Sequence, residues 1–173
     1  MPTPPSVRLA LPGEAAAITY VQRAAWASDE VESRFLDEIG EADMRDAWEQ
    51  AILRPPLAHY RVLVAIDEST LVGFAAVGPS ADPDADARDA EVAEFVIHPD
   101  ARGIGHTSRL EHAVVDTLRA DGYKVARWWL RSTDDALRAF LAESGWVPDG
   151  ATREVGNEEG TLRLKQVRVH TSL

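Results

Sequence analysis

The chain has 173 residues, a formal net charge of −11 and no cysteine. This length suits one domain spanning residues 1–173, able to bury a core without disulfides or a structural metal. The absence of thiols excludes disulfides, thiolate metal sites and a cysteine nucleophile. The acidic balance argues against nucleic acid or an anionic membrane as a partner, because both attract clustered Lys and Arg.

No apolar run reaches the roughly 18 residues that a membrane span needs. The first residues, MPTPPSVRLALPGE, also lack the basic and apolar segments of a secretion signal. We therefore expect a cytoplasmic protein. An acidic surface is compatible with an amine-bearing substrate, although solubility is the simpler explanation of the charge.

Hydrophobic periodicity predicts helices and strands along the whole chain. In chain order we expect a strand at 7–10, helices at 14–27 and 43–53, strands at 60–66 and 71–77, a strand, Gly-rich turn and helix between 90 and 118, a strand at 125–130, a helix from about 132 to 144, and strands at 151–155 and 161–169. This order predicts an α+β fold, also describable as layered α/β, with a mixed, mostly antiparallel sheet flanked by helices.

The loop GPSADPDADARD carries alternating aspartates at positions 82, 84 and 86, as at the start of a calcium loop. That motif needs Gly at its sixth position and Glu at its twelfth, where this chain has Ala87 and Ala93. We therefore expect a solvated loop between two strands and no metal site.

The segment RGIGHT, residues 102–107, joins an apolar strand to a helix. A helix N-terminus offers unpaired N–H groups and a partial positive charge, and Gly residues let an anion come close. Arg102 adds a charge-assisted donor. The turn therefore predicts phosphate binding, although an ordinary strand-to-helix loop explains the glycines equally well. A dinucleotide fingerprint needs a third Gly where Ser108 stands, and the Gly-Lys-Ser/Thr of a P-loop is missing.

This segment resembles the GNAT superfamily of coenzyme A-dependent N-acyltransferases. The family pattern is an apolar strand, Pro, Arg or Gln, two residues, Gly, one residue, Gly or Ala, and a Leu soon after. Its positions are filled without a gap by Ile97, Pro99, Arg102, Gly105, Thr107 and Leu110. The predicted element order agrees with the family fold over nearly the whole chain, and DDALRAFLAESGW resembles the family's late helix and following strand.

The resemblance implies that acetyl-CoA binds as co-substrate. Its pantetheine arm would pair with backbone groups near Phe95 and Ile97, where the family's central strand diverges from the next, and Asp134 stands where the family often has Asn. The pyrophosphate would lie on the turn made by Arg102, Gly103, Ile104, Gly105, His106 and Thr107.

The resemblance also implies that an amine of a small molecule or peptide attacks the thioester directly in a ternary complex. A homodimer is a further expectation, since related proteins often dimerise. Glu91 and Glu94 are the candidates for a general base, with solvated strand acids as the alternative. Strict strand alternation sends them to opposite faces, so only one is expected to line the cleft, and the family alignment slightly favours Glu91.

Two positions depart from the family pattern. Thr107 replaces the usual Gly or Ala; its hydroxyl is able to cap the helix or reach a phosphate, while its β-branch narrows the approach. Leu141 stands where a Tyr often protonates the departing thiolate, so this acid is missing. Solvent, or another hydroxyl such as Tyr123 or Ser144, is the candidate to replace it. The alternative function is a non-catalytic acyl-CoA-binding or regulatory module.

Other conspicuous side chains have simpler interpretations. His98 and His106 flank the turn, and we expect solvated or capping roles for them, not metal binding. Trp128 and Trp129 are neighbours on a strand, so we expect one in the core and the other on the acceptor side.

Overall fold

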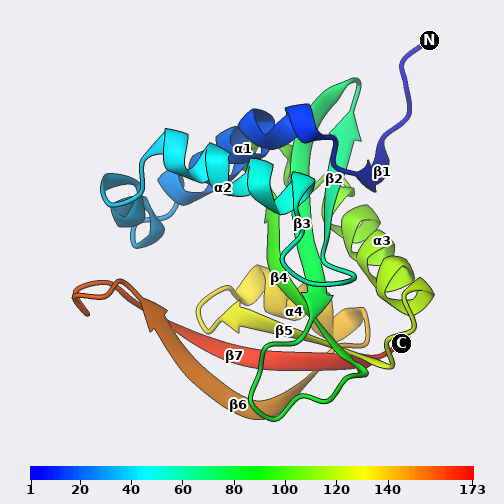
Figure 1. The fold of residues 1–173 in the computed structure, drawn as a ribbon, viewed down its shortest axis with the longest axis vertical. Coiled ribbons are helices and arrows are strands. Elements are labelled where there is room, and N and C mark those ends of the chain that lie inside the picture. Colours follow the sequence, from blue (N-terminus) through cyan, green and yellow to red (C-terminus); the bar gives the residue numbers. More distant parts are fainter.

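The computed structural model describes all 173 residues and contains one seven-stranded sheet with helices on both faces (Figure 1). The strands are β1 (Ser6–Leu9), β2 (Arg61–Asp67), β3 (Thr70–Pro79), β4 (Asp89–Ile97), β5 (Val125–Arg131), β6 (Val147–Gly156) and β7 (Arg163–Ser172). The helices are α1 (Ala15–Ala27), α2 (Glu41–Leu53), α3 (His106–Ala120) and α4 (Asp135–Glu143), with short 3₁₀ helices η1 (Pro12–Glu14), η2 (Glu32–Asp37) and η3 (Pro99–Ala101). None of the helices combines the length and apolar character that crossing a membrane requires.

The predicted α+β fold is confirmed, because the strands follow the order β1-β2-β3-β4-β5-β7-β6 and only β4 and β5 pair in parallel. The predicted strands and main helices are all present, with shifted ends. The sequence pattern missed η2 and the early start of β6, where the register with β7 shifts between Pro148 and Thr152. The long β6–β7 hairpin runs at an angle to β3 and β4 (Figure 1).

Two hydrophobic cores lie on opposite faces of the sheet. On one face, Leu110, Val114 and Leu118 of α3 are fully buried, and their four-residue spacing puts them on one side of the helix. On the other face, Ile18 and Val21 of α1 pack with apolar residues of β2 and β3. Strand β3 is therefore packed on both sides, with Ala75 and Val77 in one core and Phe74 and Ala76 in the other.

The sheet opens between β4 and β5. These strands pair only over residues 89–92 of β4 and 125–128 of β5, while β5 continues to pair with β7 along its whole length. Residues 94–97 of β4 therefore pair with β3 alone. Half of β4 thus keeps a free backbone edge at the middle of the sheet.

A β-bulge changes which way the carboxylates of β4 point. Ala93 is an extra residue on β4 with no partner on β3, whereas Glu91 lies opposite Gly78 and Glu94 opposite Ala76. Residues two apart on β3 face the same way, so both glutamates lie on the α1 face of the sheet. The expectation that alternation separates them is wrong, because the bulge adds one residue between them.

The β3–β4 loop is mostly exposed, as expected from its sequence, but ion pairs of Asp82 and Asp84 also hold it to the sheet. Arg168 of β7 donates to Asp82 at 3.0 Å and to Asp84 at 2.8 Å, and Arg127 of β5 donates to Asp84 at 2.7 Å. The side chains of Asp82 and Arg168 are 6% and 9% exposed, respectively, so their charges neutralise each other largely out of water. These contacts pin the loop to the sheet beyond the opening.

We predict that Arg168→Gln lowers the free energy of unfolding at neutral pH by about 3 kcal/mol, because it leaves the buried Asp82 without its main partner. The Arg168 guanidinium, followed by Arg127, also holds the pKa of Asp84 well below its usual range. A carboxylate with a lowered folded-state pKa stabilises the fold above its unfolded pKa and loses this effect on acidification. The difference between wild type and variant should therefore narrow below about pH 4.

Urea unfolding at a series of pH values measures this difference. Arg163→Gln is the matched control, because Arg163 makes an exposed ion pair with Glu154 at 3.3 Å and should contribute little. A stability gap for Arg168→Gln that stays constant on acidification would contradict the role given to Asp84.

Candidate active site

Two adjoining cavities lie where β4 and β5 separate. The first, of about 440 Å³, is named here the turn cavity and is lined by Phe95, Ile97, Arg102, Gly103, Gly105, Thr107, Ser108, Asp134, Ala136, Leu137 and Phe140. The second, of about 480 Å³, is named the central cavity and is lined by residues of α1, η2, β4, β5 and the β6–β7 hairpin. Because Phe95, Asp134 and Leu137 line both, the two cavities form one continuous site.

The turn cavity presents a row of backbone donors. The N–H groups of residues 102–108 have no partner in the protein, and α3 begins directly behind them. Gly103 and Gly105 have φ angles of 78° and 96°, the left-handed region in which other residues are strained. Arg102 donates its Nε–H to the carbonyl oxygen of Ile97 at 3.3 Å, which leaves its terminal nitrogens for a ligand. This arrangement suits a phosphate or pyrophosphate group.

Most residues predicted for the cofactor lie together around this cavity. Phe95, Ile97, Arg102, Gly103, Gly105, Thr107 and Asp134 all line it. The side chains of Ile104 and His106 do not: Ile104 is 63% exposed, and His106 is 2% exposed with its Nε2 3.2 Å from Asp67. These two residues therefore offer the cavity only backbone N–H groups.

Sequence reasoning missed four lining residues. Ser108 is the next residue in the first turn of α3, so helix position alone would have identified it. Ala136, Leu137 and Phe140 line the cavity from α4, with a helical spacing that also marks a core face. Asp134 caps α4 by accepting the backbone N–H of Leu137 at 3.1 Å, which fixes the start of this helix at the cavity.

The two histidines beside the turn have different roles. His98 caps η3, because its Nδ1 accepts the N–H of Asp100 at 3.1 Å, and its ring stacks on Tyr20. The solvated or capping role expected for His106 is wrong. It is buried between Asp67 and the guanidinium of Arg109, which lies 3.1 Å from its Nδ1.

Glu94 is an uncommitted carboxylate of the central cavity. It makes no hydrogen bond or ion pair within the protein. Water reaches its side chain through the open cavity, yet protein on several sides displaces much of its hydration. This desolvation, with a smaller contribution from the negative charge of Glu32, raises the pKa of Glu94 to about 7.

Glu91 lies outside both cavities, next to the β3–β4 loop. Its pKa is raised by burial first and then by the charge of Asp82, while a backbone N–H bond from Ala81 opposes the shift. Both glutamates share a face of the sheet, but Glu91 lies where β4 still pairs with β5, whereas Glu94 lies beyond that pairing, at the opening between the strands.

Neither hydroxyl that the sequence offers as a replacement acid, Tyr123 or Ser144, lies at the cavities. Leu141 is fully buried in the core, and its neighbour Phe140, which does line the turn cavity, has no proton to donate. Ser144 donates its hydroxyl to the carbonyl of Phe140 at 3.0 Å, and Tyr123 is buried before the start of β5. Neither predicted acid therefore replaces the Tyr that is missing at Leu141.

The tryptophan pair divides as expected. Trp128 is 3% exposed and packs against Phe95 and Trp146 in the core. Trp129 points to the other face, where its indole N–H donates to Asp82 at 2.9 Å and the guanidinium of Arg153 lies 4.3 Å from its ring centre. Trp129 and Arg153 both line the central cavity.

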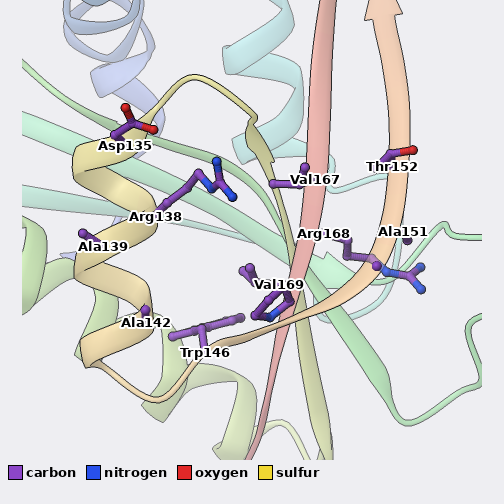
Figure 2. A pocket seen from close by; sticks show the side chains of 12 residues that line it. Asp135, Arg138, Ala139, Ala142, Trp146, Ala151, Thr152, Val167, Arg168 and Val169 are labelled. Atoms are coloured by element: carbon purple, nitrogen blue, oxygen red, sulfur yellow. The ribbon is translucent and has the colours of Figure 1, made fainter.

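A separate cavity of about 360 Å³ lies between α4 and the β6–β7 hairpin (Figure 2). Its lining includes no residue of the Gly-rich turn and neither glutamate of β4. Arg138 donates to the carbonyl of Ser132 at 2.8 Å, and Arg168 is held by its aspartates. This cavity therefore lacks the groups that make the turn and central cavities a candidate site.

The chain is similar to acetyltransferases in sequence and in fold. The model of the acetyltransferase (GNAT) family matches residues 23–146. Mycothiol acetyltransferase from Nocardiopsis dassonvillei is 32% identical over 109 residues, which are 62% of this chain and 29% of that protein. The chain thus matches less than a third of the length of this relative.

Solved structures share the fold at low sequence identity. An N-acetyltransferase from Staphylococcus aureus Mu50 superposes with a TM-score of 0.78 at 18% identity, covering 98% of this chain and 99% of that one. The protein yncA from Salmonella typhimurium, solved with its cofactor acetyl-CoA, has a TM-score of 0.75 at 21% identity, covering 99% and 95%. Ribosomal-protein-alanine N-acetyltransferase from Brucella melitensis has a TM-score of 0.75 at 20% identity, covering 96% and 99%.

We predict that Gly103→Ala and Gly105→Ala each weaken the binding of coenzyme A about tenfold. A side chain at these positive φ angles costs about 1–2 kcal/mol, and relief of that strain turns the N–H groups away from a common centre. Gly122→Ala is the matched control, because Gly122 has a φ of 90° in the α3–β5 turn, away from both cavities. Calorimetric titration and thermal unfolding should show similar destabilisation in all three variants and weaker binding only in the first two. Equal affinity in all three would contradict the assignment of the turn.

Proposed function

Because this chain belongs to the GNAT acetyltransferase family, we propose that it moves an acetyl group from acetyl-CoA to the primary amine of a small molecule or peptide. One observation carries the proposal: the unpartnered N–H groups of the turn, the free edge of β4 and the uncommitted carboxylate of Glu94 meet at a single opening. The acetyl-CoA reported with yncA, which has the same fold, is consistent with it.

In this proposal backbone groups hold most of the acetyl-CoA. The N–H groups of residues 102–108 and the Arg102 guanidinium bind the pyrophosphate. The amides of the pantetheine arm pair with the free edge of β4, and Phe95, Leu137 and Phe140 supply apolar contacts along the turn cavity. The acetyl thioester supplies an activated carbonyl, and its position between the strands directs it toward the central cavity.

Glu94 acts as the general base of the proposed reaction. An amine is largely protonated at neutral pH and must lose a proton before its lone pair attacks. A carboxylate with a pKa near 7 is well matched to accept that proton, either directly or through one water. The C–N bond then forms, the C–S bond breaks, coenzyme A leaves as a thiolate, and the nitrogen of the new amide releases its second proton to solvent.

Solvent protonates the departing thiolate in this scheme. A thiolate is a fairly good leaving group, because thiols have a pKa of about 8.5. Leu141 and Phe140 provide no acid, and the central cavity is open to water. The loss of one general acid, worth about 10²–10⁴-fold, leaves measurable turnover.

Two measurements test the proposed function. Calorimetry with acetyl-CoA and coenzyme A tests the cofactor site, and failure of both to bind at millimolar concentration would refute the proposal. Release of free thiol in the presence of a broad panel of amines tests catalysis. Binding without thiol release would instead favour a non-catalytic acyl-CoA-binding module, the alternative to which the apolar Leu141 and Phe140 point.

We predict that Glu94→Gln lowers kcat about 10²–10⁴-fold at pH 8, because the amide cannot accept a proton. In the wild type, kcat/KM should rise as the pH increases through about 7, since only the ionised carboxylate acts as base. The variant should lack this limb of the pH profile. Glu91→Gln is the matched control and should keep the limb; loss of the limb in Glu91→Gln alone would show that the base is Glu91.

A further inference from the structure

The central cavity contains two charged groups that have no ion-pair partner within the protein. One is the carboxylate of Glu94, described above. The other is the guanidinium of Arg153 on β6, which makes no ion pair with any carboxylate of the protein. Arg131, the remaining arginine of the cavity, is neutralised by Asp29 at 2.6 Å and Glu32 at 2.9 Å. Arg153 is therefore the one cation of the cavity that is free to meet a ligand.

Arg153 is held in position by uncharged contacts. Its Nε–H donates to Oε1 of Gln166, its partner across the β6–β7 ladder, at 2.7 Å. Its planar guanidinium lies over the ring of Trp129, with 4.3 Å between the central carbon and the ring centre. Both terminal nitrogens have no acceptor in the protein. This is a preorganised two-pronged donor, the geometry that matches a carboxylate.

The surroundings of Arg153 leave its charge without a counter-ion. Partial burial lowers its pKa, and the more distant charges of Asp82 and Glu91 act in the opposite direction. Asp82 is already bound by Arg168 and by the indole of Trp129. A guanidinium stays protonated in such a setting, so an anion from outside the protein would gain a charge-assisted pair.

Arg153 and Glu94 do not neutralise each other. They form no ion pair, and neither contributes to the pKa shift of the other, although both line the same cavity. A ligand that satisfies both must carry a positive or proton-donating group at one end and an anion at the other.

We propose that the acceptor carries a carboxylate in addition to its amine, and that Arg153 binds this carboxylate while the amine faces Glu94. The inference rests on the proposed acetyl transfer and narrows its substrate class to amino acids and short peptides with a free carboxylate. Arg153 is then a specificity-determining residue, since it contacts the acceptor away from the reacting atoms.

Matched pairs of acceptors test the proposal. Each amino acid is compared with its own carboxamide, which keeps the amine and side chain and loses only the negative charge. The amine of the carboxamide is the weaker base, so its larger neutral fraction favours the carboxamide in the absence of recognition. We expect kcat/KM to be higher for the acids. ω-Amino acids and dipeptides of increasing length then report whether the carboxylate belongs to a free amino acid or to a peptide C-terminus.

Arg153→Gln should remove this preference. We expect kcat/KM for the acids to fall about 10- to 100-fold, mainly through KM, with little change for the carboxamides. Arg163→Gln is the matched control, because Arg163 of β7 is exposed and already paired with Glu154. It should change kcat/KM neither for the acids nor for the carboxamides. Unchanged acetyl-CoA affinity in Arg153→Gln shows that the variant remains folded. Carboxamides that match the acids, or a preference that survives Arg153→Gln, would overturn the inference while acetyl transfer stands.

A binding measurement separates failure of the inference from failure of the proposed function. Calorimetric titration of the same acids and carboxamides into the protein saturated with coenzyme A requires no turnover. Tighter binding of the acids that depends on Arg153 supports the inference even if no acetyl transfer is detected. Equal binding of both in the wild type overturns it.

Discussion

The separation of β4 from β5 after four paired residues is the constraint on which the rest of the structure depends. It leaves half of β4 with an unpaired backbone edge, which in an ordinary sheet invites pairing with another chain. Here the edge is enclosed between the Gly-rich turn and α4 on one side and α1 with the β6–β7 hairpin on the other. The fold is thereby supplied with a strand-shaped binding site that needs no particular side chain.

Ion pairs join the elements that surround this opening. Arg127 and Arg168 fasten the β3–β4 loop to β5 and β7, and Arg131 ties η2 to the end of β5 through Asp29 and Glu32. Each of these cations has acidic partners within the protein. Glu94 and Arg153, which both line the central cavity, have no ion-pair partner within the protein. Charged groups without a partner in a partly desolvated site are candidates for function.

The turn cavity and the central cavity place different requirements on the amino-acid sequence. In the turn cavity the donors are backbone N–H groups, so the requirement on the sequence is two glycines in the left-handed region at the start of a helix. In the central cavity the polar groups come from strands far apart in the sequence, and their directions follow from register. The turn cavity is therefore determined by residues close together in the sequence, and the central cavity is not.

The sequence by itself determined the element order, the Gly-rich turn before a helix and the absence of a Tyr at Leu141, because periodicity, glycine placement and residue identity are local properties. Only the tertiary structure decided that Glu94 and not Glu91 lines the cavity, because the bulge at Ala93 and the end of the β4–β5 pairing after Val92 both depend on how the strands pair. The tertiary structure likewise decided that the loop aspartates form ion pairs with arginines from β5 and β7, while Arg153 forms no ion pair with a carboxylate. Long-range register and packing set these contacts, and no spacing within one segment encodes them.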